Sequence, residues 1–300
     1  MKYKHLAGIG FSIIFGLSFL FSKQALEFVS PIGLIAYRFL IAWLFFMLAY
    51  VFKLVKIQFD KKMFKYLLLC GLFQPVIYFM TESYGLNLLG TGEAGLMIAI
   101  IPIFVTILSA IFLKEMPRKS QIIFMLMSII GVMVIQLSQL GHDNQLLGFV
   151  FMFIAVIAAS LFNITSRYIS KTVTPITSTF FMTTMGALVF NTIYTIELLL
   201  NDSLSLYITN LNHIELIIPI LYLGIVASVG GFFLVNTTLK HMPAHVSSIY
   251  TNISTVIAIV AGLLFLNEYL YIYHYIGAVL ILVGVYGTVK FQSTKSHISN

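Results

Sequence analysis

Charged residues are scarce in this chain. Only 27 of its 300 residues are Asp, Glu, Lys or Arg, whereas an ordinary soluble domain of this length has roughly 75. A water-soluble surface is built from charge, and a disordered chain needs still more of it. The scarcity therefore excludes a soluble enzyme and a disordered protein. Together with a hydrophobic content of 60%, it indicates a chain whose solvent is lipid.

Disulfide pairs, metal-ligand patterns and nucleotide-binding loops are also missing. The single cysteine, Cys70, cannot form an intrachain disulfide. The seven histidines show no His-x-x-His or Glu-x-x-His pairing, so we expect no metal site. Residues 90–95 match a dinucleotide-binding glycine pattern, but no strand precedes them. The spans offer no nucleophile–base pair, so we expect no cofactor, no direct use of ATP and no enzyme activity.

Long apolar runs fill the chain instead. A helix needs about 20 apolar residues to cross a bilayer, and turn residues or charges separate ten such runs here. No small-residue cleavage site follows the first run, so we expect it to be retained. The ten predicted spans are Leu6–Leu26, Ile32–Phe52, Phe64–Tyr84, Ala94–Leu113, Ile122–Leu140, Leu147–Thr165, Ser178–Leu200, Ile214–Val235, Val246–Leu266 and Tyr273–Val289.

The positive charges alternate between the ends of these spans. Lys and Arg are retained on the cytoplasmic side of short loops. With ten spans and the N-terminus inside, the inside segments hold 15 of the 17 basic residues: Lys2, Lys4, Lys53, Lys56, Lys61, Lys62, Lys65, Lys114, Arg118, Lys119, Arg167, Lys171, Lys240, Lys290 and Lys295. The outside segments carry acidic residues: Glu27, Glu93, Asp143, Glu197, Asp202, Glu215 and Glu268. The pattern predicts a multi-pass protein of the cell membrane with both termini cytoplasmic, and it explains the net charge of +7 without a nucleic-acid partner.

The two halves of the chain resemble each other. A shift of 153 residues carries Lys114-Glu115 onto Asn267-Glu268, and a shift of 144 carries Ser22-Lys23 onto Ser166-Arg167. Further pairs under these shifts are Gly71 with Gly224, Phe79 with Phe232, and Pro31 with Pro175. Five spans in each half is an odd number, so the halves must face opposite ways, as in many secondary transporters. We predict two inverted five-helix repeats, residues 1–141 and 142–300.

Several short motifs occur in a specific order, and those at the end of the first half recur at the end of the second. They are Phe15-Gly16-Leu17-Ser18-Phe19, Ser30-Pro31, Arg38-Phe39-Leu40, Ile101-Pro102-Ile103-Phe104, Phe112-Leu113-Lys114-Glu115, Ile130-Gly131-Val132, Phe265-Leu266-Asn267-Glu268 and Gly277 with Gly284. This pattern resembles the EamA-type members of the drug/metabolite transporter superfamily over about residues 6–290. The resemblance implies an all-α bundle of ten helices around a central cavity, which moves small metabolites by alternating access, often outward.

We therefore expect a secondary transporter for a small molecule such as an amino acid, a related metabolite or a drug-like compound, with export as the direction. The lipid bilayer is the second expected partner, and a homodimer is left open. A non-transporting scaffold or receptor and an uptake permease of the same fold are the alternatives. An accessible, polar-lined cavity favours transport, whereas a solid apolar centre favours a scaffold.

Three charges lie inside or beside the predicted spans, where charge is expensive. Lys23, Arg38 and Glu82 should share one level close to the outer mouth. They form either an ionic gate or substrate clamp, or a structural ion pair with a snorkelling lysine. Glu115 and Glu268 end equivalent helices, and we expect them to cap neighbouring backbone or to lie at the headgroups.

Polar residues within the spans are the remaining candidates for a substrate cavity. Some must face the cavity and others only hydrogen-bond between helices. The candidates are Gln74, Tyr78, Asn163, Tyr194, Asn236, Tyr250 and Asn252. Pro102 should interrupt its helix, and the second repeat, with Thr255 in its place, should lack that kink. Gly277 and Gly284 lie on one helix face and should admit a close neighbour.

Overall fold

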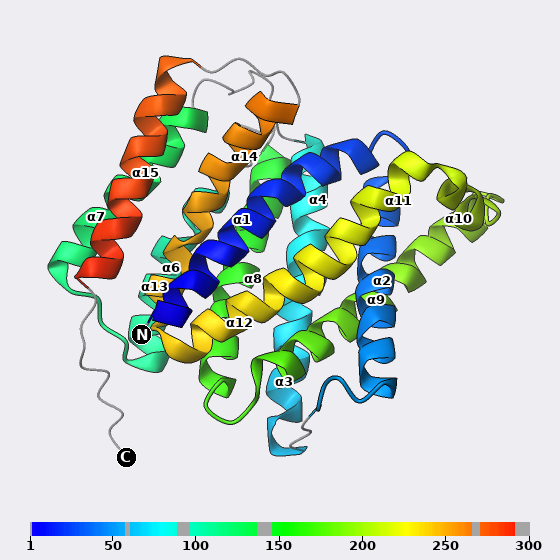
Figure 1. Ribbon diagram of the computed structural model, residues 1–300, viewed down its shortest axis with the longest axis horizontal. Coiled ribbons are helices and arrows are strands. Elements are labelled where there is room, and N and C mark those ends of the chain that lie inside the picture. The colour runs from blue at the N-terminus through cyan, green and yellow to red at the C-terminus, as the bar shows by residue number, and fades with distance from the viewer. Residues whose placement is uncertain (1, 58–60, 89–96, 137–145, 266–270, 292–300) are drawn as a thin grey trace.

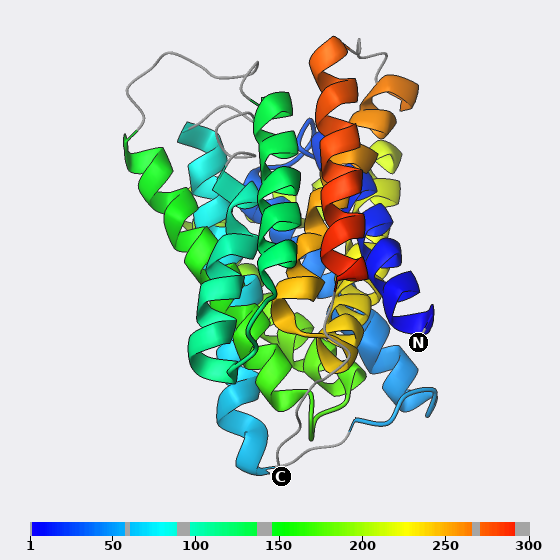
Figure 2. The same cartoon turned by 90° about the vertical axis from the view of Figure 1, so that its left-hand side faces the viewer.

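The chain forms a bundle of long helices that stand side by side (Figures 1 and 2). The computed structural model describes residues 2–57, 61–88, 97–136, 146–265 and 271–291. Some predicted features lie outside these residues, namely the glycines at 90–95, the acidic residues Glu93, Asp143 and Glu268, and the basic residue Lys295.

Each half supplies a series of helices. The first half contains α1 (Lys2–Ala25), α2 (Pro31–Val51), η1 (Lys61–Met63), α3 (Phe64–Gly71), η2 (Leu72–Ile77), α4 (Tyr78–Leu88), α6 (Ile101–Leu108), η3 (Ser109–Leu113) and α7 (Lys119–Gln136). The second half contains α8 (Leu146–Ile169), α9 (Pro175–Leu200), α10 (Leu206–Thr209), η5 (Asn210–Asn212), α11 (Ile214–Leu221), η6 (Tyr222–Gly231), α12 (Phe232–His241), α13 (Ala244–Ile249), α14 (Thr251–Phe265) and α15 (Ile272–Lys290).

Ten apolar helical segments correspond to the ten predicted spans. Eight are long and apolar enough to cross a membrane: Tyr3–Ala25, Pro31–Val51, Lys61–Gly85, Leu146–Ile169, Pro175–Leu200, Ile214–His241, Ala244–Phe265 and Ile272–Lys290. Two are shorter within the described residues, Met97–Leu113 and Lys119–Ile135. Several helices extend past the predicted apolar run, because backbone hydrogen bonding and capping, rather than hydropathy, decide where a helix ends.

The second helix of each half begins with the same capping arrangement. Ser30 Oγ accepts a hydrogen bond from the Gly33 amide at 3.2 Å, and Thr174 Oγ1 accepts one from the Thr177 amide at 3.3 Å. A proline follows the capping residue in both helices. Proline is favoured there because the first amides of a helix have no intrahelical acceptor. The Ser-Pro and Thr-Pro breaks of the sequence therefore start α2 and α9 in the same way.

The packing of the two halves is exchanged, as an inverted repeat requires. α1, the first helix, packs on α14 and on the η6–α12 segment of the second half. Its counterpart α8 packs on α6 and on the α3–η2–α4 segment of the first half. α2 packs against its counterpart α9, and α7 against its counterpart α15. Because successive spans alternate in direction, α1 and α8 run opposite ways through the bundle.

Backbone-to-backbone contact joins α7 and α15. A Cβ atom on Gly277 would lie 2.5 Å from the Gly131 carbonyl oxygen, and a Cβ on Gly284 would lie 2.6 Å from the Phe124 carbonyl oxygen. No side chain larger than hydrogen fits in these spaces. The prediction that Gly277 and Gly284 admit a close neighbour is confirmed, and the neighbour is α7.

The helix breaks differ from the expected kink. Pro102 lies in the first turn of α6, so it starts a helix after a break at Ile100 rather than bending one. α14 passes through Thr255 unbroken, as expected, but the second half breaks nearby, at Tyr250 between α13 and α14. The expectation of no kink at Thr255 is therefore confirmed, and the break at Tyr250 is a separate feature of the second half. No proline causes this break; instead the Ser12 hydroxyl donates to the Tyr250 carbonyl at 2.7 Å and competes with helical hydrogen bonding.

Candidate functional site

Arg38 lies at the contact between the two halves. Its side chain projects from α2, is 8% exposed, and donates from Nε to Ser228 Oγ of η6 at 2.7 Å. The guanidinium carbon lies 4.8 Å from the centre of the Phe79 ring and 5.7 Å from that of Phe39. Both distances are within the range of cation–π attraction. A hydroxyl and two aromatic faces thus compensate part of the cost of placing this cation in an apolar bundle.

The two terminal nitrogens of Arg38 are left available. Within the described residues, the side-chain hydrogen bond of Arg38 comes from Nε, and the two terminal nitrogens make none. Among the described residues, three fully enclosed side-chain atoms have no hydrogen-bond partner: Ser178 Oγ, His245 Nδ1 and Ser254 Oγ. The terminal nitrogens of Arg38 are not in this group. The terminal nitrogens of this nearly buried side chain are therefore neither fully enclosed nor hydrogen-bonded within the described residues. An unpaired guanidinium fork matches the two oxygens of a carboxylate.

Glu82 lies close to Arg38 but does not pair with it directly. The carboxylate is half-buried on α4 and accepts a hydrogen bond from the Tyr78 hydroxyl at 2.8 Å. Across the described residues, the ion pair within 4.0 Å is a different one, between Arg167 and Glu115. The opposite charges of Arg38 and Glu82 still act on each other across the interior. The structure thus brings Arg38, Tyr78 and Glu82 together as a group with one charge of each sign.

Two π-helices border this group at equivalent places in the two halves. η2 covers residues 72–77, and the 153-residue shift carries it onto residues 225–230, inside η6. Gln74 leaves the helical conformation altogether, with φ −145° and ψ 115°, next to Pro75. π-helices and interrupted helices are frequent at functional sites, because they leave backbone groups free. Gln74 therefore lies four residues before Tyr78, and an irregular backbone positions its half-buried side chain.

Aromatic rings fill the junction between these segments. Phe79 and Phe232, which are equivalent in the two halves, have ring centres 6.4 Å apart. Phe39 contacts both, at 5.5 Å and 6.4 Å, and stacks on Phe190 at 5.7 Å. α2 is held close to α9, because a Cβ on Gly186 would lie 2.6 Å from the Phe39 ring. Equivalent aromatic residues of the two halves are therefore in contact beside Arg38.

Most of the other predicted residues lie elsewhere. Lys23 is exposed in the last turn of α1, whereas Arg38 is buried. Asn163 donates to the Ala159 carbonyl of its own helix at 2.8 Å. Asn252 donates to Ser128 of α7 at 3.1 Å, and the Tyr250 hydroxyl lies 2.8 Å from Nδ1 of His5 in α1. Pro102 starts α6, as described above.

Tyr194 belongs to a tyrosine cluster at the end of the bundle away from the start of α1. Its ring centre lies 5.8 Å from that of Tyr37 and 5.4 Å from that of Tyr207. The Tyr37 hydroxyl donates to the Tyr207 carbonyl at 2.8 Å, which ties α10 of the second half to α2 of the first. Asn210 adds a longer bond of 3.4 Å to the Tyr194 hydroxyl. Tyr194 therefore contributes to a covered end rather than to the Arg38 group.

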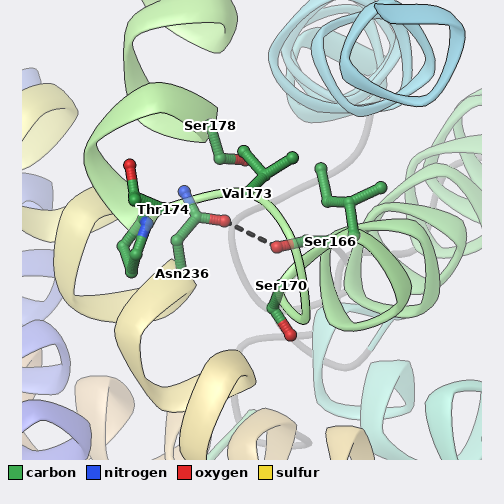
Figure 3. A pocket seen from close by; sticks show the side chains of 8 residues that line it. Ser166, Ser170, Val173, Thr174, Ser178 and Asn236 are labelled. Atoms are coloured by element: carbon green, nitrogen blue, oxygen red, sulfur yellow. Dashed lines mark hydrogen bonds between the residues drawn. The ribbon is translucent and has the colours of Figure 1, made fainter. Parts of the chain in front are cut away.

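Asn236 lies in a small pocket near the opposite end, between α8, α9 and α12 (Figure 3). The pocket is packed too tightly to hold a water molecule, and it is lined by Ser166, Ile169, Ser170, Val173, Thr174, Pro175, Ser178 and Asn236. Ser166 donates to Asn236 Oδ1 at 2.6 Å, and Asn236 Nδ2 donates to Thr179 at 3.0 Å. Sequence reasoning missed the hydroxyl residues. The available signal was spacing, since Ser166 and Ser170, like Thr174 and Ser178, lie four residues apart on a helical face.

A second feature missed by sequence reasoning is the ion pair at the same end. Arg167 Nε lies 2.8 Å from Glu115 Oε1. Glu115 Oε2 also accepts the Ala244 amide at 2.8 Å, and Arg167 Nη1 donates to the Leu239 carbonyl at 2.7 Å and the Lys240 carbonyl at 3.0 Å. The expectation that Glu115 caps neighbouring backbone is confirmed. In the sequence, Arg167 served only as one of the basic residues that mark the inside face. The available signal was its correspondence with Lys23 under the 144-residue shift.

Comparison with protein families accounts for both halves. The family model described as the EamA-like transporter family matches residues 2–137 and again residues 146–290. The chain belongs to this family. It is accordingly a multi-pass membrane protein of a transporter family, and the resemblance noted in the sequence is confirmed. The EamA-like fold also agrees with the exchanged packing of the two halves.

Relatives cover nearly the whole chain. It is 32% identical over 287 residues to YcxC of Bacillus subtilis (strain 168), named an uncharacterized transporter, with 95% of this chain and 92% of that protein covered. An uncharacterized transporter of Archaeoglobus fulgidus is 29% identical over 276 residues, which cover 92% of this chain and 94% of that one. A solved crystal structure superposes with a TM-score of 0.75 at 16% identity, over 96% of this chain and 98% of the other, and supports the fold.

Proposed function

We propose that this protein is a secondary transporter of the cytoplasmic membrane that moves a small metabolite by alternating access, in the outward direction. Its two inverted halves would expose one shared site first to one side and then to the other. Both termini would lie in the cytoplasm. Candidate cargoes are an amino acid, a related metabolite or a drug-like compound.

The observation that carries this proposal is Arg38 with its available guanidinium fork between the two halves. A scaffold could fill its centre with apolar side chains, and a buried cation would then only cost stability. Here the charge lies beside two irregular helices and a wall of Phe rings, with Glu82 nearby. This arrangement suits a cargo with an apolar body and a carboxylate that both terminal nitrogens of Arg38 would bind.

Counterflow into proteoliposomes tests transport directly. Purified protein would be reconstituted into vesicles preloaded with one unlabelled compound, and uptake of its labelled form would be followed across a panel of amino acids, organic acids and drug-like amines. We expect counterflow of carboxylate-bearing members without ATP, because a secondary transporter exchanges cargo down its gradient. A strict need for ATP would contradict the proposal. No counterflow from any member would favour a scaffold or receptor.

Direction is tested in cells. With a compound identified by counterflow, cells that contain the protein should retain less of it after loading than cells that lack the protein. Greater accumulation instead would indicate an uptake permease of the same fold. Arg38→Gln should abolish the difference between the two cell types, whereas the exposed arginine Arg118, changed to Gln, serves as the matched control.

A further inference from the structure

An ion pair ties the two halves together at the end of the bundle where α1 begins and α12 ends. We propose that Glu115 and Arg167 form a gate that closes the transport path at this end and opens when the pair breaks. The inference rests on the proposed alternating-access function. Glu115 follows the fourth span of the first half, whereas Arg167 and its backbone partners, the carbonyls of Leu239 and Lys240, belong to the second half.

The exposure of the pair allows it to open and close. The side chains of Arg167 and Glu115 are 18% and 17% exposed. An ion pair that water reaches contributes little to stability, because solvent screens the attraction and can hydrate both groups when they part. A fully buried pair would instead leave two stranded charges on breaking. The observed pair therefore suits a reversible contact better than a permanent tie.

Buried polar atoms without partners lie beside the pair. Ser178 Oγ and His245 Nδ1 are enclosed and make no hydrogen bond. Ser178 lies in the first turns of α9, and His245 directly follows Ala244, whose amide binds Glu115. An enclosed polar atom without a partner costs stability, and water that entered on opening would supply the missing partner.

The pair also borders the hydroxyl-lined pocket of Figure 3. Ser166 of α8 and Ser170, which directly follows α8, flank Arg167 in the sequence and both line that pocket. The Ser170 hydroxyl lies 3.5 Å from the Leu239 carbonyl, which is the carbonyl that Arg167 also contacts. Movement of Arg167 away from Leu239 would therefore loosen one wall of the pocket. An opened gate would connect the hydroxyls of the pocket with the aqueous side.

The sequence doubles both charges of the pair. Under the shifts that relate the halves, Arg167 corresponds to Lys23 and Glu115 to Glu268. If the ion pair only held one end of the bundle together, charged residues would not be needed at the counterpart positions Lys23 and Glu268, which belong to the other end. An alternating gate does need them, because each end must close in turn.

Thiol labelling tests the gate without any substrate. The reporter is Ser178→Cys in a Cys70→Ala background, because Ser178 lines the pocket and its hydroxyl has no bond to lose. A membrane-impermeant methanethiosulfonate would be applied from the side on which α1 begins. We expect Glu115→Gln and Arg167→Gln each to raise the labelling rate roughly two- to fivefold, the range that the loss of a water-exposed ion pair gives.

Two controls separate gating from loosened packing. Lys171→Gln removes an exposed positive charge from the same end and should leave the rate unchanged. In chains without the reporter, the buried native Cys70 should stay unreactive in both gate variants. The proposal is overturned if the reporter rate does not rise, if Lys171→Gln raises it equally, or if Cys70 becomes reactive in parallel. If the labelling result fails in this way, the gate is wrong but the proposed transport is not contradicted. If labelling behaves as expected but no compound shows counterflow, the transport proposal alone is contradicted.

Discussion

A charge inside a bilayer needs compensation, and Arg38 receives only part of it from the protein. Ser228 takes one of its hydrogen bonds and the Phe79 ring one face. Glu82 balances the charge from a distance, but its hydrogen bond is with Tyr78. The two side chains therefore do not form a closed ion pair, and this favours binding of a cargo over an ionic gate at this level.

Single and double substitutions separate these two roles. Arg38→Gln should weaken counterflow by at least about 10-fold, because even one hydrogen bond to a charged group contributes about 1.5–3 kcal/mol and the cargo would lose two. Glu82→Gln should impair counterflow less. The double variant should remain as poor as Arg38→Gln, because the fork that binds the cargo is still absent. The measurement is the initial counterflow rate, normalised to the amount of protein in the membrane.

Recovery in the double variant would contradict this assignment. It would mean that each single change strands a charge which the second change removes, as a direct ionic gate requires. Normal counterflow in both single variants would leave Arg38 as an interfacial anchor. Arg118→Gln, at an exposed position, controls for the general effect of removing an arginine.

Arg38, Glu82 and Tyr78 could be predicted from the sequence, whereas Ser228 could not. An ionisable residue within an apolar run is conspicuous, because insertion of its charge is costly. Ser228 is one of many hydroxyl residues in the spans, and a hydroxyl can satisfy itself on its own helix. Only the fold, which carries η6 against α2, selects it. Arg167 was overlooked for a related reason, since a basic residue at a helix end needs no partner.

At the scale of helices, the irregular segments η2 and η6 are the features that the sequence predicts least well. In the third span, Pro75 accompanies the interruption at Gln74, because proline cannot donate a helical hydrogen bond. The matching π-helix η6 has no proline, and its sequence reads as one continuous apolar helix. Close packing against α2 accompanies the irregularity there, since a Cβ on Gly224 would lie 3.0 Å from the Arg38 carbonyl oxygen. Such a cause is tertiary and leaves no local pattern.

The α7–α15 contact gives a test at the same scale. Gly277→Ala should lower the free energy of unfolding by about 1–3 kcal/mol, because the added methyl group meets the Gly131 carbonyl and forces the helices apart. Gly230→Ala is the matched control, since a Cβ there would find its nearest neighbour 3.9 Å away. Thermal unfolding of the purified variants in detergent measures the difference. Equal stability of the two variants would show that the helices do not approach so closely.

At the scale of the whole molecule, charge and symmetry predicted more than local propensity. The number of spans followed from the alternation of Lys and Arg between segments, because a wrong count would mix basic and acidic loops. The inverted repeat followed from two sequence shifts and an odd number of spans per half. Which polar side chains meet depends on how α2, η2 and η6 cross. Neither charge nor hydropathy encodes that crossing. Among the candidates, Asn163 therefore bonds within its own helix, and Asn252 and Tyr250 bond to other helices instead.

Orientation in the membrane is a prediction of this same charge pattern. Cysteines placed at Ser205 and at Lys56 would report the two faces, since both positions are exposed and lie in segments predicted outside and inside, respectively. The native Cys70 is buried and adds little background. In intact cells, an impermeant maleimide should modify Ser205→Cys and not Lys56→Cys, and after permeabilisation it should modify both. The reverse pattern would invert the proposed topology. Labelling of both in intact cells would break the alternation of charge on which the ten spans were counted.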